Sequence, residues 1–469
     1  MRLIQSATHA HPPPQRRANE RRFSVAALAP ALIAALLTIE EAAAQGRSLS
    51  EIRVEELEAL GYLEKAEPSS RESGVKVHDT ARVQPGMNVY CSSWSGEVRL
   101  FTNEGEIRKN VRLEHDGVGG GCHVEPFGPD ALIAVSRPDV SVFDLRGKVR
   151  WASDADHHHD VAQGPDEELY TLTARAGSLR RGPDLWPILD HAITALDEVG
   201  RPRDRLVFSE VFADRVDGRR LSRMLRAKKQ TGSFESRGYV RASDVFHPNS
   251  IQVLKQPLSG GKAGDVLLCI RELDLVAIVD LEEKRVVWEW GPGELDAPHH
   301  ATILENGHIL VFDNGRRRRW SRVVEIDPAS KRIVWQYRAD GFFSKLRGAA
   351  QRLPNGNTLI TESTKGRAFE VTPAGDVVWE FFTPDVTDEG ERRQMYRLLR
   401  LLPGAETARF LDALSPDVDI GGYRGPAHFA SNGPLPICSR IGTTVGFVIE
   451  RRCQFAPSTT SVWPEMKRP

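Results

Sequence analysis

Short histidine-bearing segments recur at the same point of a repeat along much of this chain. Each segment precedes a turn and a strand-like stretch such as residues 304–311. A repeat that brings one imidazole per unit to an equivalent position predicts a ring of histidines about a common axis. The segments are Cys122-His123-Val124, His158-His159-Asp160-Val161, His247-Pro248-Asn249-Ser250 and His299-His300-Ala301-Thr302.

The repeat itself has a period of roughly 40–50 residues. Trp288, Trp335 and Trp379 end equivalent segments, and short alternating strands are separated by Gly, Asp and Asn turns. Three or four such strands per unit are typical of propeller blades, so we expect an all-β, six-bladed β-propeller. The recurring tryptophans are expected to form blade-to-blade core. The expected units are about 87–113, 122–152, 158–208, 247–290, 299–337 and 348–382.

Four regions are expected along the 469 residues. Residues 1–45 have the order of a secretory signal: arginines, an uncharged stretch, then small residues. An uncleaved membrane anchor is the alternative, although the 17-residue stretch is short for spanning a bilayer. The protein is therefore expected to be periplasmic or secreted. The other regions are a short helical segment and linker (46–86), the catalytic propeller (87–400, with an insertion at 213–245) and an unassigned tail (401–469).

Composition limits the partners. The chain is 40% hydrophobic and 27% charged, as soluble proteins are, and its net charge of -1 argues against nucleic acid. The five cysteines lack zinc-site spacing, so no metal is expected, and Cys438 and Cys453 are spaced plausibly for a disulfide. No convincing nucleotide motif is present, so no cofactor is expected. A homodimer stays open, and membrane contact is expected only through an uncleaved N-terminus.

A histidine cluster can bind a metal, act as nucleophile and general acid or base, or be satisfied polar core. Arg271 lies in a strand-like stretch that should reach the same channel, which favours an anionic substrate group over a metal cation. Asn249 follows His247 by two residues, so both should face one side of an extended segment. The four arginines at 316–319 are expected mainly as an exposed loop, and residues 391–402 look helical.

Several of these segments together resemble the bacterial arylsulfotransferases, which move sulfate between phenols without a nucleotide donor. The segments are HHDV, HPNS, HHATILENGHILVFDNG and LPNGNTLITES, with Arg271, and the resemblance covers about 80–400. It implies an exported six-bladed propeller and a ping-pong reaction with aryl sulfates and phenols. It also implies a sulfated nucleophile at His299, supporting histidines at His159 and His247, sulfuryl contacts from Asn249 and Arg271, and further pocket residues at Thr361 and Glu362. His123, His300 and Asn314 complete the expected substrate-binding set.

One departure bears on activity. The family usually has aspartate after the nucleophile, where this chain has His300, so either His299 or His300 is a candidate nucleophile. Spacing to Leu304 and Gly307 favours His299. Two other functions are open: a quinoprotein-like propeller, suggested by the repeated Val-Trp dipeptides, and a non-catalytic binding scaffold.

Overall fold

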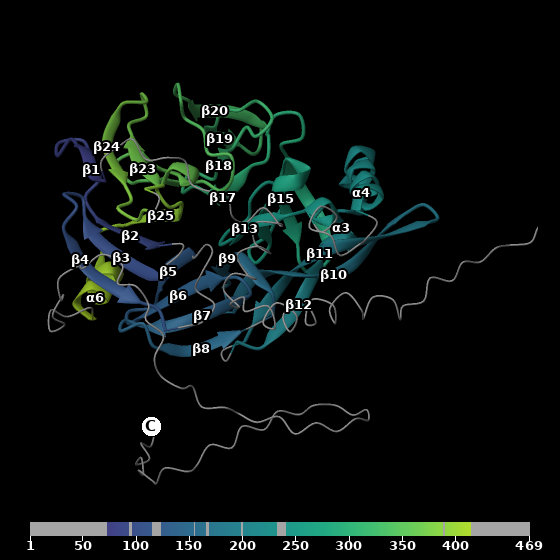
Figure 1. Ribbon diagram of the computed structural model, residues 1–469, viewed down its shortest axis with the longest axis horizontal. Helices are drawn as coiled ribbons and strands as arrows, with labels where there is room; N and C mark the ends of the chain where they lie inside the picture. Colours follow the sequence, from purple (N-terminus) through teal and green to yellow (C-terminus); the bar gives the residue numbers. More distant parts are fainter. Residues whose placement is uncertain are drawn as a thin grey trace, which may run out of the picture. The chain divides into compact units, whose positions relative to one another are not determined.

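The computed structural model describes residues 73–413, apart from 93–95, 115–122, 154, 166–167, 198–199, 232–240 and 388–389. The described residues form six antiparallel sheets, which are the blades of a β-propeller (Figure 1). The expected all-β, six-bladed fold is confirmed. The expected signal, the helical segment that follows it and Cys438 and Cys453 lie outside the described residues. No helix of the described part is long and apolar enough to span a membrane.

Four blades are built from four consecutive strands each, as the sequence repeat predicted. The second blade has β5 (His123–Phe127), β6 (Ala131–Ser136), β7 (Asp139–Asp144) and β8 (Val149–Ser153). The third has β9 (His157–Gln163), β10 (Leu169–Arg181), β11 (Asp184–Leu196) and β12 (Pro202–Val207). The fourth has β13 (Pro248–Val253), β14 (Val266–Ile270), β15 (Leu275–Asp280) and β16 (Arg285–Trp290). The fifth has β17 (His299–Ile303), β18 (Ile309–Asp313), β19 (Arg322–Asp327) and β20 (Arg332–Tyr337).

The other two blades join segments from opposite ends of the described chain. The first blade contains β2 (Met87–Ser92), β3 (Glu97–Thr102), β4 (Ile107–Arg112) and β25 (Met395–Leu401), which pairs with β2. The sixth contains β21 (Ala349–Arg352), β22 (Thr358–Glu362), β23 (Arg367–Val371), β24 (Val377–Phe382) and β1 (Gly74–His78), which pairs with β24. In Figure 1 the yellow-green β25 lies beside the blue β2.

The helix expected at 391–402 is therefore wrong. The apolar and basic residues of this segment fit a helical period, but the inner edge of β2 offers unpaired backbone groups that a strand can satisfy. The pairing runs in register from Met87 opposite Leu401 to Ser92 opposite Met395, with one irregularity. Tertiary pairing thus overrides the local helical pattern.

The strand at one edge of each sheet lies nearest the propeller axis. This set is β25, β5, β9, β13, β17 and β21. Around the ring, β25 contacts β5 and β21, β17 contacts β21 and β13, β13 contacts β9, and β9 contacts the second blade at β6 and β7. The histidine segments stand at the beginnings of four of these inner strands, so the repeat brings their side chains to one end of the channel.

The insertion after β12 contains α3 (Phe208–Val211), η2 (Ala213–Arg215) and α4 (Gly218–Thr231). Met224 of α4 belongs to the core cluster that also holds Leu179 and Ile188 of the long β10–β11 hairpin. Two further short 3₁₀ turns, η3 (Arg271–Leu273) and η4 (Ser363–Lys365), follow β14 and β22. After β25, α6 (Ala405–Ala413) buries Phe410 among residues of the first two blades.

The recurring tryptophans connect neighbouring blades, as expected. The indole N–H of Trp288 donates to Pro328 O at 2.9 Å, and that of Trp335 donates to Pro373 O at 2.9 Å. Trp379 donates to Asn103 O at 2.8 Å and is fully buried. Each acceptor lies in the next blade of the ring. The same bond therefore fastens the fourth, fifth and sixth blades to their successors.

We expect Trp379→Phe to lower the free energy of unfolding more than Trp335→Phe does. The first change leaves the Asn103 carbonyl buried without its donor, which costs about 1–3 kcal/mol, and adds a small cavity. Trp335 is half-buried, so water can replace its bond and the loss should stay near 1 kcal/mol. Urea titration monitored by circular dichroism measures both. Equal losses would contradict the larger contribution that we expect from the buried bond of Trp379.

Candidate active site

A bulge at the beginning of the inner strand shapes the site in three consecutive blades. The ladder register shifts beside His159 in β9, at Asn249 in β13 and at His300 in β17. His159, His247 and His300 have positive φ values of 66°, 50° and 47°. Left-handed backbone at a non-glycine residue costs roughly 1–2 kcal/mol, so packing must hold it in place. Bulges re-aim side chains, which lets adjacent residues serve different neighbours.

This geometry corrects one expectation. The segment from His247 to Asn249 is not extended, because His247 is left-handed and Asn249 is the extra residue of the bulge. Alternation therefore does not place their side chains on one side. Asn249 Nδ2 instead donates to Pro298 O at 2.8 Å, which ties the fourth blade to the residue before His299. Its Oδ1 is buried and accepts no hydrogen bond from the described residues.

His299 is held by the side chain of Asn314, at the end of the adjacent strand β18. His299 Nδ1 lies 2.7 Å from Asn314 Oδ1. Asn314 Nδ2 donates to Ser344 O at 2.8 Å and to Arg347 O, so the amide oxygen must face the imidazole. His299 Nδ1 therefore carries the proton in the neutral ring, and Nε2 carries the lone pair. A basic Nε2 is what a histidine nucleophile needs.

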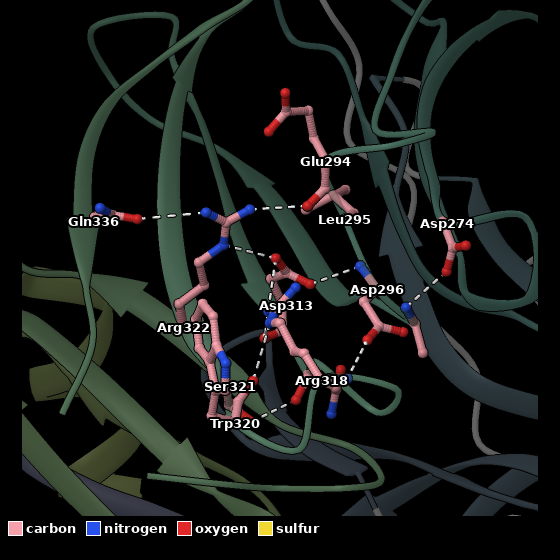
Figure 2. Close-up of polar contacts among 12 residues, drawn as sticks. Asp274, Glu294, Leu295, Asp296, Asp313, Arg318, Trp320, Ser321, Arg322 and Gln336 are labelled. Atoms are coloured by element: carbon pink, nitrogen blue, oxygen red, sulfur yellow. Dashed lines mark hydrogen bonds and ion pairs between the residues drawn. The ribbon is translucent and has the colours of Figure 1, made fainter. Parts of the chain in front are cut away.

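A second set of contacts holds Asp313, the residue before Asn314 in the sequence (Figure 2). The buried carboxylate of Asp313 pairs with Arg322 Nε at 2.8 Å and Arg318 Nη2 at 2.9 Å, and accepts from Asp296 N at 2.9 Å. Ser321 Oγ donates to Asn314 O at 2.7 Å. In the arginine run at 316–319, Arg318 thus turns inward toward an anion. The contacts of Asp313 leave Asn314 little freedom to rotate away from His299.

His159, His247 and Arg271 lie around His299. The rings of His159 and His247 are 5.0 Å apart at 75°. Burial lowers the pKa of His299 well below its usual value, and the positive charge of Arg271 lowers it further. The same two causes lower the pKa of His247 to about 4. Burial, then His247, lowers the pKa of His159. These four side chains interact as one cluster, and its imidazoles are neutral at neutral pH.

Arg271 is paired with a neighbouring carboxylate. Its Nε donates to Glu272 Oε1 at 3.1 Å, and Glu272 also pairs with Arg220 of α4 and with Arg316 at 3.5 Å. Burial alone would raise the pKa of Glu272, but Arg271, Arg220 and Arg316 outweigh it and lower the pKa to about 2. Arg223 also lies 3.7 Å from Glu272, so one carboxylate faces four guanidinium groups and this side of the site carries excess positive charge.

His123 and His300 belong to a second group, centred on Arg397 of β25. Arg397 Nη1 lies 3.1 Å from His123 Nε2 and 3.3 Å from Asp160 Oδ1. His300 Nδ1 accepts from Ala350 N at 3.2 Å. Burial and then Arg397 lower the pKa of His300 well below its usual value. His300 thus faces Arg397 and has no contact with Asn314 among the described residues, and the geometry favours His299 as nucleophile.

One cluster has the composition of a metal site. Ligand atoms of His123, Glu125 and Asp160 lie within 4.8 Å of one another. Arg397 Nη1 lies within 3.5 Å of an atom of each of them. A guanidinium therefore already provides the positive charge that a cation would bring, and the cluster is a buried ion-pair network.

Thr361 and Glu362 make other contacts. Thr361 Oγ1 accepts from Leu398 N at 3.1 Å, which joins the sixth blade to β25. Glu362 accepts from Phe343 N at 3.0 Å and pairs with Arg367 at 2.9 Å. Among the contacts of the described residues, neither side chain reaches a histidine. Their part in a substrate pocket stays a prediction.

Sequence reasoning missed several residues of the site. Asp244 was assigned to the insertion, yet its carboxylate bonds His247 Nδ1. Tyr396 and Arg397 were hidden in the segment expected to be helical, and Tyr396 OH donates to His159 O at 3.1 Å. A signal for them existed: the first unit, at 87–113, has room for only three strands. A closing strand from elsewhere in the chain was therefore needed, and it would bring residues to the channel.

Comparison with known proteins points to one family. The family model described as "Arylsulfotransferase (ASST)" matches residues 151–383. No protein with a curated description matches the chain. Among solved structures, a Bacteroides caccae protein of unknown function is 14% identical over 67% of this chain and 98% of its own, with a TM-score of 0.44. Periplasmic gluconolactonase of Pseudomonas aeruginosa is 12% identical over 68% and 99%, with a TM-score of 0.37.

Likenesses this low to solved structures carry no functional argument. The family match covers the third to sixth blades, including β9, β13 and β17 with His159, His247 and His299. It confirms the resemblance drawn from the short motifs and supports arylsulfotransferase activity in general. Over residues 151–383, this chain belongs to the arylsulfotransferase family.

Proposed function

We propose that this protein is an exported sulfotransferase that moves a sulfuryl group from an aryl sulfate to a phenol through a sulfated His299. The observation that carries the proposal is the bond from His299 Nδ1 to the fixed amide oxygen of Asn314. It leaves the lone pair on Nε2, inside a buried cluster that contains a guanidinium. A neutral nucleophile beside a fixed cation suits attack on an anionic sulfate ester.

The reaction divides into two balanced halves. In the first, His299 Nε2 attacks sulfur, an N–S bond forms, and the S–O bond to the aryl group breaks with its electron pair. The phenolate that leaves takes a proton from the site. In the second, the site removes a proton from the acceptor phenol, whose oxygen attacks sulfur and restores neutral His299. No nucleotide or metal is needed in either half.

Arg271, His159 and His247 have separate tasks in this proposal. Arg271 holds the sulfuryl oxygens, because its charge is buried and acts electrostatically on His299 and His247. His159 and His247 transfer the phenolic proton, since their rings flank each other and neither is charged at neutral pH. The excess of arginines around Glu272 favours entry of anionic donors.

His300 does not weaken the proposal. An aspartate after the nucleophile would offer the imidazole an acceptor, but Asn314 already supplies one at 2.7 Å. Asn314 therefore acts as a positioning residue, with its amide oxygen and nitrogen both engaged within the protein. The export of the chain rests on the signal-like residues 1–45, and its donors and acceptors are small phenolic molecules.

His299→Ala should abolish transfer from 4-nitrophenyl sulfate to phenol, by at least about 10³-fold, because no other group replaces the nucleophile. The matched control is His308→Ala on the turn of the same blade, where His308 bonds only the outer residues Asn306 and Glu325 among its described contacts. It should keep full activity. Transfer that survives in His299→Ala but is lost in His300→Ala would move the nucleophile by one residue. Unchanged transfer in both variants would place the nucleophile at another residue, and no transfer by the folded wild type would favour a different function.

Asn314→Ala should lower kcat by about 100-fold with KM nearly unchanged, because the imidazole loses its tautomer and orientation. Asn357→Ala is the matched control, since Asn357 is a buried amide that bonds Arg82 O and Glu370 at the outer turn of the sixth blade. Steady-state kinetics on folded variants measures both. A drop in the control as large as that in Asn314→Ala would indicate general damage to the fold.

The rate of His299 sulfation by 4-nitrophenyl sulfate should stay constant as the pH falls through 6.5, where free imidazole becomes half protonated. Burial and Arg271 depress the pKa of His299, so the nucleophile stays neutral below that pH and is lost only when the pH falls through the depressed value. Stopped-flow release of nitrophenol measures this rate. A midpoint near pH 6.5 would contradict the depressed pKa.

A further inference from the structure

Two supporting histidines are joined through residues that the reaction described above does not use. His159 Nδ1 lies 2.8 Å from His158 Nδ1, and His158 Nε2 lies 3.0 Å from His191 Nδ1. His191 Nε2 lies 3.0 Å from Asp244 Oδ1, and the other carboxylate oxygen bonds His247 Nδ1. All five side chains are buried. They come from β9, β11 and the segment before β13, and the contact of the His159 and His247 rings closes the circuit.

The direction of every bond follows from the carboxylate. Asp244 is ionised, because His247 and His191 outweigh the effect of burial and hold its pKa well below the usual value. It accepts from Nε2–H of His191, and a ring with that single proton accepts at Nδ1. His158 must then donate from Nε2 and accept at Nδ1, and His159 must donate from Nδ1. The bonds all point toward Asp244, and His159 and His247 each carry the lone pair on Nε2.

A hydrogen-bonded series with this direction can transfer a proton from one end to the other while all heavy atoms stay in place. A proton that arrives at His159 Nε2 allows Nδ1–H to shift to His158, His158 Nε2–H to shift to His191, and His191 Nε2–H to shift to Asp244. His247 is bonded to that carboxylate directly. Other charges around the chain are Arg137 near His158, Asp190 at His191 N, and Arg271 and Glu272 near His247. With Arg271 close by, one carboxylate stabilises one added proton far better than two.

We propose that His158, His191 and Asp244 couple His159 and His247 into one unit that carries a single exchangeable proton in each half-reaction. This rests on the proposed sulfotransferase function. The unit takes up one proton from solvent when the anionic donor binds, and gives it to the departing phenolate while the N–S bond to His299 forms. In the second half it takes the proton of the acceptor phenol and returns it to solvent. His158, His191 and Asp244 are positioning residues, since they act through His159 and His247.

The test compares an aryl sulfate whose leaving phenolate must be protonated with an aryl sulfate whose leaving phenolate need not be. Phenolate from phenyl sulfate is strongly basic, as tyrosinate is with a pKa of about 10, whereas nitrophenolate leaves without help. His191→Gln can keep a donor for Asp244 and an acceptor for His158, but an amide cannot take up a proton on one side and release one on the other. We expect His299 sulfation by phenyl sulfate to fall about 100-fold, and sulfation by 4-nitrophenyl sulfate to fall less than about threefold.

His157→Gln is the matched control. His157 is buried next to the relay, and its Nε2 bonds Ser153 Oγ at 2.9 Å, which glutamine can imitate. The ratio of the two donor rates should stay as in the wild type. A folded His191→Gln protein in which both donors lose rate equally, or neither does, would overturn the proposal, because a purely structural change has no reason to depend on the leaving group.

Histidine ¹⁵N spectra of the unaltered protein test the relay without any turnover. They should show Nδ1–H on His159 and His247, and Nε2–H on His158 and His191. The opposite tautomer at His158 or His191 would contradict the relay even if transfer were intact. If neither donor reacts with the wild type while these tautomers are found, the sulfotransferase function fails and the hydrogen-bonded unit stands.

Discussion

Ring closure by β25 is the constraint on which the rest of the structure depends. β25 completes the inner edge of the first blade by pairing with β2, and it joins the last blade to the first. Arg400 strengthens this joint, because its Nε bonds Asn88 at 2.7 Å and its Nη1 bonds Glu370 at 3.1 Å. Closure also places Tyr396 against His159 O and Arg397 against His123. Without it, the inner strands would have no common axis and the histidines would not converge.

Within the closed ring, the site is organised by a small number of buried charges. Burying a neutral imidazole costs little free energy when its nitrogens are hydrogen-bonded, whereas burying an ion costs much more. The chain therefore uses one carboxylate, Asp244, to orient two histidines, and a neutral amide, Asn314, to orient the nucleophile. Arg271 is the charge left for an anionic substrate. The same principle explains why Arg397 sits among His123, Glu125 and Asp160, where each charge has a partner.

Much of the fold and of the site could be predicted from the sequence, because residues at the same position of each repeat occupy equivalent places in each blade. Periodicity predicted six blades, and the histidine segments predicted a ring of His123, His159, His247 and His299. The last three converge, whereas His123 lies in the group around Arg397. Contacts made across the ring left no local pattern: β25 has a helical period, and Asp244 lies at the end of an insertion. The bulges were also not predicted, because side-chain alternation holds only where the backbone is extended, and at His247 it is not. The amide of Asn314 was recognised as a site residue, but only its two carbonyl partners define its orientation.

The most direct test of the central claim is to identify the atom that carries the sulfuryl group. The protein would be mixed with donor in the absence of acceptor, quenched at neutral to alkaline pH, digested and mapped by mass spectrometry, with ¹⁵N spectra to distinguish the ring nitrogens. The account predicts one sulfuryl group on Nε2 of His299. Sulfation of His300, His247 or Nδ1 of His299, or turnover without any modified histidine, would contradict it.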